Sequence, residues 1–431
     1  MKKKVDLDSS SSYVKKIQNM FGITNSERII YDDVNLDLIK DAQITCISGP
    51  SGSGKSLIGR TIEKRYGYSK VPLKVENEIP IIESLNVPFE KSLYYLNMVG
   101  LSEAYLYLTP YENLSTGQQF RYYLAQILLS GVSKVLIDEF TSFLDRDTAQ
   151  IVSYNLQKVI RKSELSIVVI TTNDDLEKYL QPDVHVKLNE FSKISIIKNN
   201  HDGGNYPFSS DIEVVNGSYD DIIPFEQYHY FDNPTCDTLE RYGGKYYCLK
   251  YKNKILGVAV TSYPYPNNVS EVSLKNINSN LRKISRIIIH PQIRGIGATK
   301  LLFLKILQNE KKVIFVRSAM SLYHPFLNKL NMKENHYHYF GNDSDFIQTM
   351  QSLNSKSHKA WQKGVNYLSK LMYKDYINYC TIIGSPVLIN QSFFLNVAED
   401  TFYVDDIELI KDVIYPINMK EYFYDNRKGN L

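Results

Sequence analysis

The hydrophobic and polar positions of the chain predict strands and helices in alternation. Residues 28–48 alternate and then become apolar, as an edge strand followed by a central strand would. Two further apolar runs, 134–138 and 167–172, resemble buried strands, and helical patterns separate the three runs. This order is typical of a parallel sheet surrounded by helices, so the sequence predicts an α/β fold.

A change of pattern marks the domain boundaries. Residues 198–211 are rich in Gly, Asn, Ser and Asp and have no periodicity. We therefore expect a first domain over 1–195, a linker at 196–211, a second α/β domain over 212–350 and a C-terminal extension over 351–431. In the second domain we expect strands at 245–252, 254–263, 284–291 and 311–318, and helices at 298–310 and 324–332.

Composition adds few constraints on function. The chain has 431 residues, enough for two or three domains. Its net charge of +3 is too small to indicate a partner, and its four cysteines are too scattered for a zinc pair. No apolar stretch approaches the roughly eighteen residues of a membrane span, and no apolar run follows the first lysines. We therefore expect a cytoplasmic protein with no membrane segment.

Residues 49–56, "GPSGSGKS", fit the phosphate-loop pattern G-x-x-x-x-G-K-[ST] between a predicted strand and helix. Backbone amides of such a loop turn toward a triphosphate, a lysine neutralises it and a hydroxyl binds Mg²⁺. Downstream, Asp138 is expected to hold Mg²⁺ and Glu139 to polarise the attacking water. The expected ATP-binding residues of the loop are Gly49, Ser51, Gly52, Ser53, Gly54, Lys55 and the metal ligand Ser56.

Two further motifs make this assignment more specific. "LSTGQQFR" at 114–121 and "TSFLD" at 141–145 resemble the signature and D-loop of ABC-type ATPases, over about residues 15–195. In that family two cassettes enclose ATP head to tail. The resemblance thus implies ATP and Mg²⁺ as ligands and a homodimer, with Ser115, Gly117 and Gln118 acting in trans and Asp145 at the dimer seam.

The chain departs from the family pattern at two places. Asn173 stands where the family usually has a histidine, which implies slow hydrolysis, and Glu76 or Glu78 lies where a glutamine is usual. The Asn173 amide is still expected to contact a phosphate. A transporter subunit that works with a separate permease is an alternative, although a fused second domain would be unusual for it.

A second glycine loop lies in "SRIIIHPQIRGIG", residues 285–297. With "ATKLLF" after it, this stretch resembles the coenzyme A loop of the GNAT acyltransferases, and the pattern fits from either Gln292 or Arg294. The resemblance implies acetyl-CoA or another acyl-CoA as a ligand; the alternative is another α/β domain with a tight turn. The implied acyl-CoA-binding residues are Ile289, Gln292, Arg294, Gly295, Ile296, Gly297, Ala298 and Thr299.

Acyl transfer needs a base for the acceptor and an acid for the departing thiolate. The family's usual tyrosine position holds Leu327, so Tyr323 is the nearest candidate acid. Glu271 and His290 are candidate bases, while His290 also suits a structural place before the turn.

Soluble ABC–GNAT fusions, which the chain resembles, suggest a nucleic-acid acceptor and possible DNA base modification. Five lysines with Trp361 and Tyr367 suit phosphate contacts and base stacking, or equally an amphipathic helix with its aromatics packed inward. Our first hypothesis is an ATP-gated acyltransferase acting on nucleic acid or a nucleotide. The alternatives are an ATP-switched binding protein with a degenerate GNAT domain, and a small-amine or protein N-acetyltransferase regulated by its ATPase. The five lysines are Lys356, Lys359, Lys363, Lys370 and Lys374.

Overall fold

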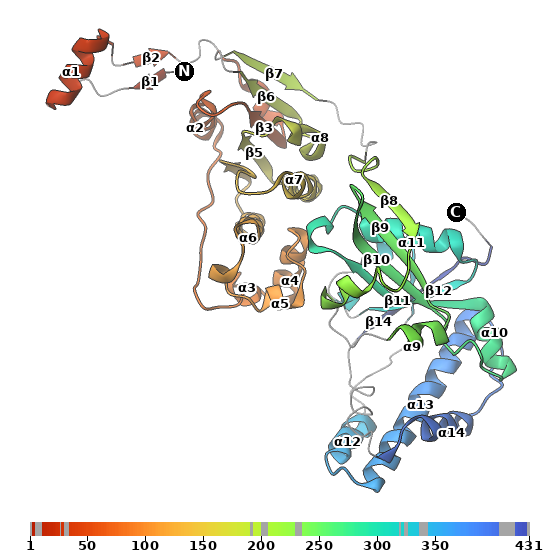
Figure 1. Cartoon of the computed structure of the whole chain (residues 1–431). Coiled ribbons are helices and arrows are strands. Elements are labelled where there is room, and N and C mark those ends of the chain that lie inside the picture. Colours follow the sequence, from red (N-terminus) through yellow and green to blue (C-terminus); the bar gives the residue numbers. More distant parts are fainter. Residues whose placement is uncertain are drawn as a thin grey trace. The chain divides into compact units, whose positions relative to one another are not determined.

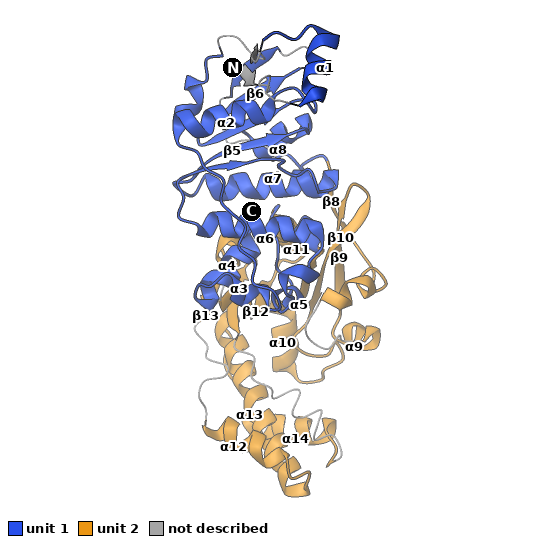
Figure 2. Ribbon diagram, turned by 90° about the vertical axis from the view of Figure 1, so that its left-hand side faces the viewer, with its two compact units in different colours: residues 1–210, 291–296 blue, residues 211–290, 297–431 orange. Residues whose placement is uncertain are grey.

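The computed structural model of the chain forms two compact units, coloured separately in Figure 2. Unit 1 contains residues 1–210 and 291–296, and unit 2 contains residues 211–290 and 297–431. Each unit has its own β-sheet and its own hydrophobic cores. The structure describes residues 2–4, 11–25, 27–29, 34–189, 193–199, 206–228, 235–318, 320–322, 326–335, 344–404 and 419–428.

Unit 1 is built on a five-stranded sheet with the strand order β4-β5-β3-β6-β7 (Figure 1). The first four strands of that order run parallel, and β7 is antiparallel to β6. The α/β expectation is confirmed here, because the central strands coincide with the predicted apolar runs. The strands are β3 (Ile44–Ser48), β4 (Lys134–Ile137), β5 (Ser166–Thr171), β6 (Val184–Leu188) and β7 (Ile194–Lys198).

Both faces of this sheet are buried, as parallel sheets require. Ile44 and Val169 belong to one hydrophobic core, whereas Ile47 and Val168 belong to the other. The alternation within single strands explains why these runs are apolar throughout. The helices of unit 1 are α1 (Ser12–Phe21), α2 (Lys55–Tyr66), α3 (Ile81–Ser84), α4 (Phe89–Met98), α5 (Ala104–Tyr107), α6 (Thr116–Leu129), α7 (Arg146–Ile160) and α8 (Glu177–Leu180).

The strand expected early in residues 28–48 differs from the structure. Within that range, β2 (Glu27–Ile29) pairs with β1 (Lys2–Lys4) in a separate sheet, and residues 30–33 lie outside the described part. A 3-10 turn at Asp37–Asp41 then precedes β3. The side chain of Asn35 accepts a hydrogen bond from the amide of Asp37 at 2.9 Å, a local bond that favours a turn over a strand.

Unit 2 contains a seven-stranded sheet with the order β13-β14-β12-β11-β10-β9-β8. Its pairs are antiparallel except for β11 and β12, which run parallel and pair only from Leu281 opposite Val313 to Lys283 opposite Phe315. Beyond that point the two strands part. The strands are β8 (Ile212–Asn216), β9 (Lys245–Tyr251), β10 (Lys254–Ser262), β11 (Leu281–Ile289), β12 (Val313–Ser318), β13 (Lys333–Asn335) and β14 (Lys420–Asp425).

Strand β14 lies in the segment that the sequence sets apart as an extension, yet it pairs with both β12 and β13. Among its described residues, helices α13 and α14 of the same segment precede β14, and α12 spans the expected boundary at residue 350. The helices of unit 2 are α9 (Cys236–Arg241), α10 (Val272–Asn280), α11 (Ala298–Asn309), α12 (Ser344–Leu353), α13 (His358–Ile383) and α14 (Gln391–Thr401).

The prediction of a helix at 324–332 is wrong for residues 326–332, the part of this range that the structure describes. There the chain forms only a 3-10 turn at Asn328–Leu330. Asn331 then takes a left-handed φ of +58°, which stops helical propagation, and β13 begins two residues later. Among the described residues, no helix combines the length and apolar character needed to cross a bilayer.

Candidate functional site

The glycine loop of unit 1 links β3 to α2 through backbone conformations that suit glycine. Gly49, Gly52 and Gly54 have φ values of +150°, +81° and +96°. A Cβ atom on Gly49 would lie 2.5 Å from the carbonyl oxygen of Leu188, whereas one on Gly52 would meet nothing within 4 Å. Gly49 is therefore needed for packing against β6, and the loop is open beside Gly52, where a phosphate could approach.

Lys55, the first residue of α2, folds back over this loop. Its Nζ donates hydrogen bonds to the carbonyl oxygens of Gly49 at 2.6 Å and Pro50 at 2.7 Å. Burial lowers the pKa of Lys55, while Asp174 and Asp138 act to raise it. The ammonium group thus lies within the loop, where phosphate oxygens could replace the two carbonyls. Ser51 and Ser56 are exposed, and Ser53 is buried.

Asp138 and Glu139 follow β4, as the sequence predicts. An Asp138 carboxylate oxygen lies 3.0 Å from Nζ of Lys70, in an ion pair for which the sequence carries no local signal. Glu139 is exposed and has a φ of +54°, and buried Thr141 has a φ of +63°. A left-handed β-branched residue is an outlier, so this turn stores backbone strain of the kind found at functional sites.

The parallel strand order brings these residues to one edge of the sheet. Loops after β3, β4 and β5 share that edge, because all three strands point the same way. The Phe140 amide donates to the carbonyl of Ile170 at 2.7 Å, and the Asn173 side chain donates to the Thr141 hydroxyl at 3.4 Å. Asn173 therefore lies beside the strained turn after β4.

The motif at 114–118 forms the N-terminus of α6. The Ser115 hydroxyl accepts a hydrogen bond from the Gln118 amide at 3.4 Å, and the Gln118 side chain accepts one from the Ser115 amide at 2.9 Å. This reciprocal pair is a capping box. A Cβ atom on Gly117 would lie 3.1 Å from a methyl group of Leu144, so the motif adjoins the "TSFLD" segment. Ser115 itself is exposed.

Asp145 caps α7 by accepting a hydrogen bond from the Thr148 amide at 3.0 Å. Burial acts to raise the pKa of Asp145, but hydrogen bonds to Thr148 and to nearby backbone hold that pKa below its ordinary value. The carboxylate is therefore kept ionised at an exposed helix end.

A network of polar side chains lies behind the loop, and the sequence pattern gave no signal of it. The Ser48 hydroxyl lies 2.9 Å from Nε2 of His185, and Nδ1 of His185 lies 3.1 Å from a carboxylate oxygen of Glu177. His185 is fully buried, and burial lowers its pKa. Because Ser48 immediately precedes Gly49, this network of side chains connects the base of the glycine loop to β6 and α8.

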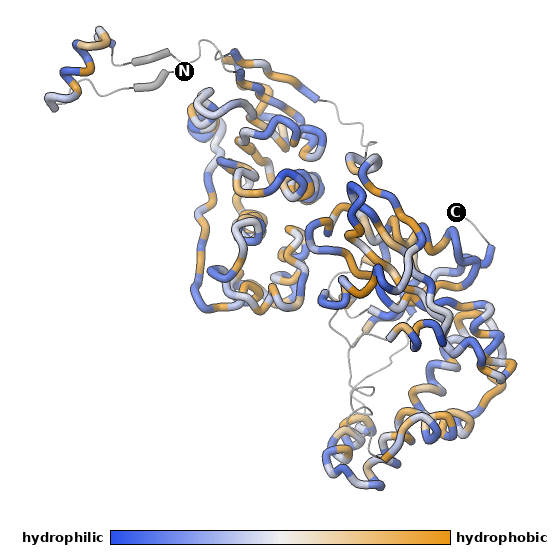
Figure 3. The backbone as a smooth tube through the Cα atoms, in the orientation of Figure 1, coloured by the Kyte–Doolittle hydropathy of each residue, from blue (hydrophilic) through white to orange (hydrophobic). Residues whose placement is uncertain are grey.

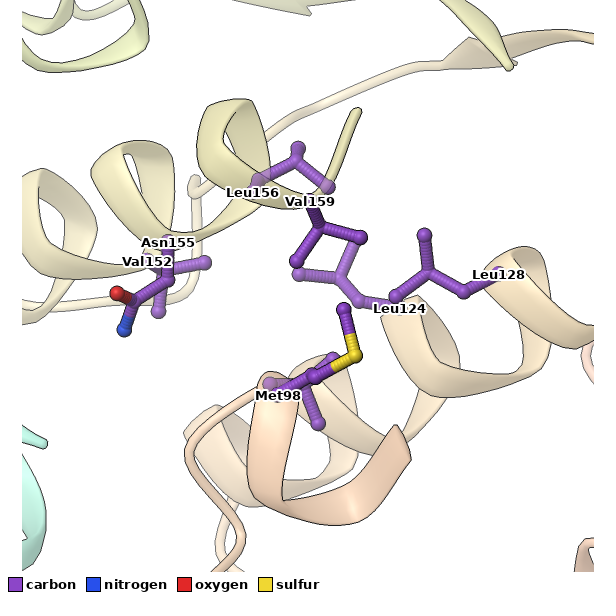
Figure 4. A pocket seen from close by; sticks show the side chains of 8 residues that line it. Met98, Leu124, Leu128, Val152, Asn155, Leu156 and Val159 are labelled. Atoms are coloured by element: carbon purple, nitrogen blue, oxygen red, sulfur yellow. The ribbon is translucent and has the colours of Figure 1, made fainter. Parts of the chain in front are cut away.

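A cavity of about 10 Å³ lies among α4, α6 and α7 (Figure 4). Such a volume holds at most one water molecule. Apart from one amide its lining is apolar, so the cavity is a packing defect and no ligand site. The lining residues are Met98, Val99, Leu124, Leu128, Val152, Asn155, Leu156 and Val159.

Residues 291–296 group with unit 1, and their carbonyls are bound there by α7. The Asn155 side chain donates to the carbonyl of Arg294 at 2.9 Å, and Nζ of Lys158 donates to that of Gly295 at 2.7 Å. Gly295 has a φ of +87°, and a Cβ atom there would lie 2.4 Å from the Asn155 amide nitrogen. Gly295 is thus required by close packing. Gln292 lies in a 3-10 turn at Pro291–Ile293, and Ile296 is buried.

In unit 2 the second glycine of this motif begins a helix. Gly297 is the N-cap of α11 with a φ of +92°, and a Cβ atom there would meet nothing within 4 Å. Ala298 and Thr299 begin the helix, and their amides precede its first hydrogen bonds, which the amides of Lys300 and Leu301 donate to the Gly297 carbonyl. Ile289 is the last residue of β11. An anion could therefore approach the helix end beside Gly297.

The candidate acids and bases of acyl transfer occupy separate structural places. The His290 amide donates a hydrogen bond to the carbonyl of Leu256 at 2.8 Å. The imidazole ring of His290 contacts the ring of Tyr228 edge-on, with the two ring centroids 5.3 Å apart. Glu271 caps α10 by accepting from the Ser273 amide at 3.4 Å. Tyr323 lies outside the described residues.

The lysine-rich segment forms α13, along which hydrophobic and hydrophilic residues intermingle (Figure 3). Trp361 donates from its ring nitrogen to the carbonyl of Phe402 at 3.1 Å, and Tyr367 is buried. Lys370 pairs with Asp345 at 2.7 Å. The aromatics pack inward, which is the second of the two alternatives for this segment.

Comparison with known proteins finds relatives of the first part of the chain. HrtA of Staphylococcus epidermidis, an ATP-binding protein assigned to hemin import, is 27% identical over 207 residues, which cover 38% of this chain and 91% of HrtA. The zinc import ATP-binding protein ZnuC of Yersinia pestis is 27% identical over 177 residues, covering 37% of this chain and 69% of ZnuC. No family model matches the chain.

The phosphonates import ATP-binding protein PhnC of Wolinella succinogenes is 29% identical over 202 residues, covering 36% of this chain and 72% of PhnC. Among solved structures, a dimeric bacterial ABC transporter cassette is 18% identical, with a TM-score of 0.33, and covers 42% of this chain and 94% of that chain. The motifs and the named relatives together identify an ABC ATPase cassette over about 40% of the chain.

Proposed function

We propose that the chain is an ATP-driven cassette joined to a GNAT-type domain that transfers an acyl group from acyl-CoA. The convergence of Lys55, Asp138 and Asn173 at one sheet edge carries the first half of the proposal. The parting of β11 from β12, together with the glycine N-cap of α11, supports the second half.

In the cassette, Lys55 and the loop amides would bind the phosphates of ATP. Ser56 and Asp138 are hard oxygen donors that suit Mg²⁺, which would neutralise phosphate charge. The Asp138–Lys70 pair, at 3.0 Å, would have to open for the carboxylate to bind the metal. Glu139 would then orient the attacking water and accept its proton.

We further propose that the chain works as a homodimer. Ser115 and Thr116 at the start of α6 are exposed, and a capping box between Ser115 and Gln118 forms this helix end. A second copy could present this helix end to the ATP phosphates, because a helix N-terminus attracts anions. The exposed carboxylate of Asp145 would lie at the seam between the copies.

In the second unit, an acyl-CoA pyrophosphate would bind at the N-terminus of α11. The open space beside Gly297 could receive such a group, and the amides of Ala298 and Thr299 at the start of the helix suit its oxygens. We propose a nucleic acid or nucleotide as the acceptor to test first, on the resemblance to the ABC–GNAT fusions. Exposed Lys359 and Lys374 could contact phosphates, whereas the inward packing of Trp361 and Tyr367 argues against base stacking.

The proposal is tested by mass spectrometry of acceptors after incubation with the protein, acetyl-CoA, ATP and Mg²⁺. DNA, RNA, added protein and a polyamine are offered together, with Lys55→Ala and Gly297→Glu variants as controls. An acyl adduct that is lost in both variants supports ATP-dependent transfer and identifies the acceptor. Bound acetyl-CoA without any adduct would favour an ATP-switched binding protein instead.

A further inference from the structure

Lys283 stands where β11 and β12 separate. Its partner Phe315 completes the last pair between the two strands. Beyond this pair, β12 continues along β14 to Ser318, while β11 continues along β10 to Ile289. Lys283 therefore lies at the apex of the opening between two parallel strands of one sheet.

Three charged groups share the face of the sheet on which Lys283 lies. Arg317 is two residues beyond Phe315, so its side chain points to the same face. It forms ion pairs with Glu421 of β14 at 2.7 Å and with Asp375 of α13. The second carboxylate oxygen of Glu421 accepts hydrogen bonds from Asn335 at 3.1 Å and Asn378 at 2.8 Å.

Lys283 is half-buried and forms no hydrogen bond or ion pair with any residue that the structure describes. Arg317 engages both nearby carboxylates, and no described carboxylate lies within ion-pair distance of the Lys283 amine. Burial lowers the pKa of Lys283 and Arg317 acts in the same direction, whereas Asp375 and Glu421 oppose them. Such surroundings shift the protonation equilibrium of the amine toward its neutral form.

The length of the opening suits an extended thioester ligand. Residues 284–289 of β11 lie beyond the apex and, with Ser285 as the extra residue of a β-bulge, span about 16 Å opposite residues 257–261 of β10. Helix α11, with its open N-cap at Gly297, packs on β9, β10 and β11. A phosphate group at that helix end would leave an extended arm free to follow β11 toward Lys283.

We infer that the Lys283 amine accepts the proton of the incoming nucleophile at the reacting end of the acyl-CoA site, an inference that rests on the proposed function. The acceptor N–H or O–H group attacks the thioester carbonyl, and its proton passes to the Lys283 nitrogen. The new carbon–nitrogen or carbon–oxygen bond forms as the carbon–sulfur bond breaks. Lys283 then returns the proton to the departing thiolate, so the step balances without another reactant.

Competitive lysine labelling tests this inference on the full-length wild-type protein. Trace labelled acetic anhydride is applied between pH 6 and 10, with and without coenzyme A, and labelling is quantified per lysine by mass spectrometry. Exposed Lys275 of α10 is the matched control, and a Lys283→Met variant verifies the peptide assignment. We expect Lys283 to become reactive at a lower pH than Lys275. We also expect coenzyme A to reduce the labelling of Lys283 at least fivefold and to leave the labelling of Lys275 unchanged.

Acetyl-CoA binding, measured separately by calorimetry, distinguishes the two levels of the argument. Two results would show that the assignment of Lys283 is wrong while the proposed function stands. In the first, acetyl-CoA binds but coenzyme A leaves the labelling of Lys283 unchanged. In the second, Lys283 becomes reactive only at the pH at which Lys275 becomes reactive. If acetyl-CoA does not bind, both the assignment of Lys283 and the proposed acyl transfer are wrong.

Discussion

At the scale of single residues, the Lys70–Asp138 ion pair should weaken the affinity for Mg²⁺. At 3.0 Å, Lys70 holds the carboxylate that the cassette would present to Mg²⁺. A partly exposed pair of this kind is worth up to about 1 kcal/mol, or roughly fivefold in affinity. We expect Lys70→Met to lower the Mg²⁺ concentration for half-maximal ATP hydrolysis by about twofold to fivefold. In a magnesium titration, an unchanged value, equal to that of a Lys74→Met control, would show that the pair does not compete with the metal.

His185 predicts a pH dependence of stability. Its folded-state pKa lies below its ordinary value of 6.5 because burial disfavours the charged ring. It therefore contributes stability that is fully present above about pH 6.5 and is lost as the pH falls through the folded value. We expect the wild-type melting temperature to fall more between pH 7.5 and 5.5 than that of a His185→Gln variant. A His358→Gln variant at an exposed site should behave like wild type, and equal falls in all three proteins would contradict this account.

At the scale of elements, two glycines of one loop should differ in their tolerance of a methyl group. Both Gly49 and Gly52 have positive φ, so alanine is strained at each, by about 1 kcal/mol. Only at Gly49 does the added Cβ also collide with the backbone of β6, at 2.5 Å from the Leu188 oxygen. We expect Gly49→Ala to destabilise unit 1 by several degrees more than Gly52→Ala in thermal unfolding. Equal melting temperatures would mean that the loop does not pack on β6.

The sequence predicts elements best where one local pattern decides them. The apolar runs at β3, β4 and β5 are buried on both faces, so their composition alone indicates central strands. Early in residues 28–48, by contrast, a hydrogen bond from the Asp37 amide to the Asn35 side chain favours a turn despite the alternating pattern. The ABC motifs were recognisable because each needs fixed residues at fixed spacing.

Other features depend on partners distant in sequence. Strand β14 joins the sheet beside β12 after a long intervening stretch whose described part includes α12, α13 and α14, and no local signal reveals that pairing. The Lys70–Asp138 pair and the Ser48–His185–Glu177 chain likewise join residues far apart in the chain. The special position of Lys283 also exists only because β11 and β12 pair and then part.

For the whole molecule, a head-to-tail homodimer makes a quantitative prediction. Lys55→Ala should disable the phosphate loop, and Gly117→Glu should disable the motif that each copy is proposed to supply to the other. Each variant should be inactive alone, but an equimolar mixture should recover about a quarter of the wild-type ATPase rate, since half the dimers are mixed and each has one intact site. Size-exclusion chromatography with light scattering verifies the dimers. No recovery from dimers shown to be mixed would contradict action in trans.

The central claim is that ATP acts on an acyl-CoA site in the same chain, and calorimetry tests it most directly. Acetyl-CoA is titrated into a Glu139→Gln variant, which should bind ATP without hydrolysing it, in the presence and absence of ATP and Mg²⁺. We predict saturable acetyl-CoA binding whose affinity changes with ATP and falls at least tenfold when Gly297→Glu is added. The absence of acetyl-CoA binding in both nucleotide states, or equal binding by the Gly297→Glu protein, would contradict the account.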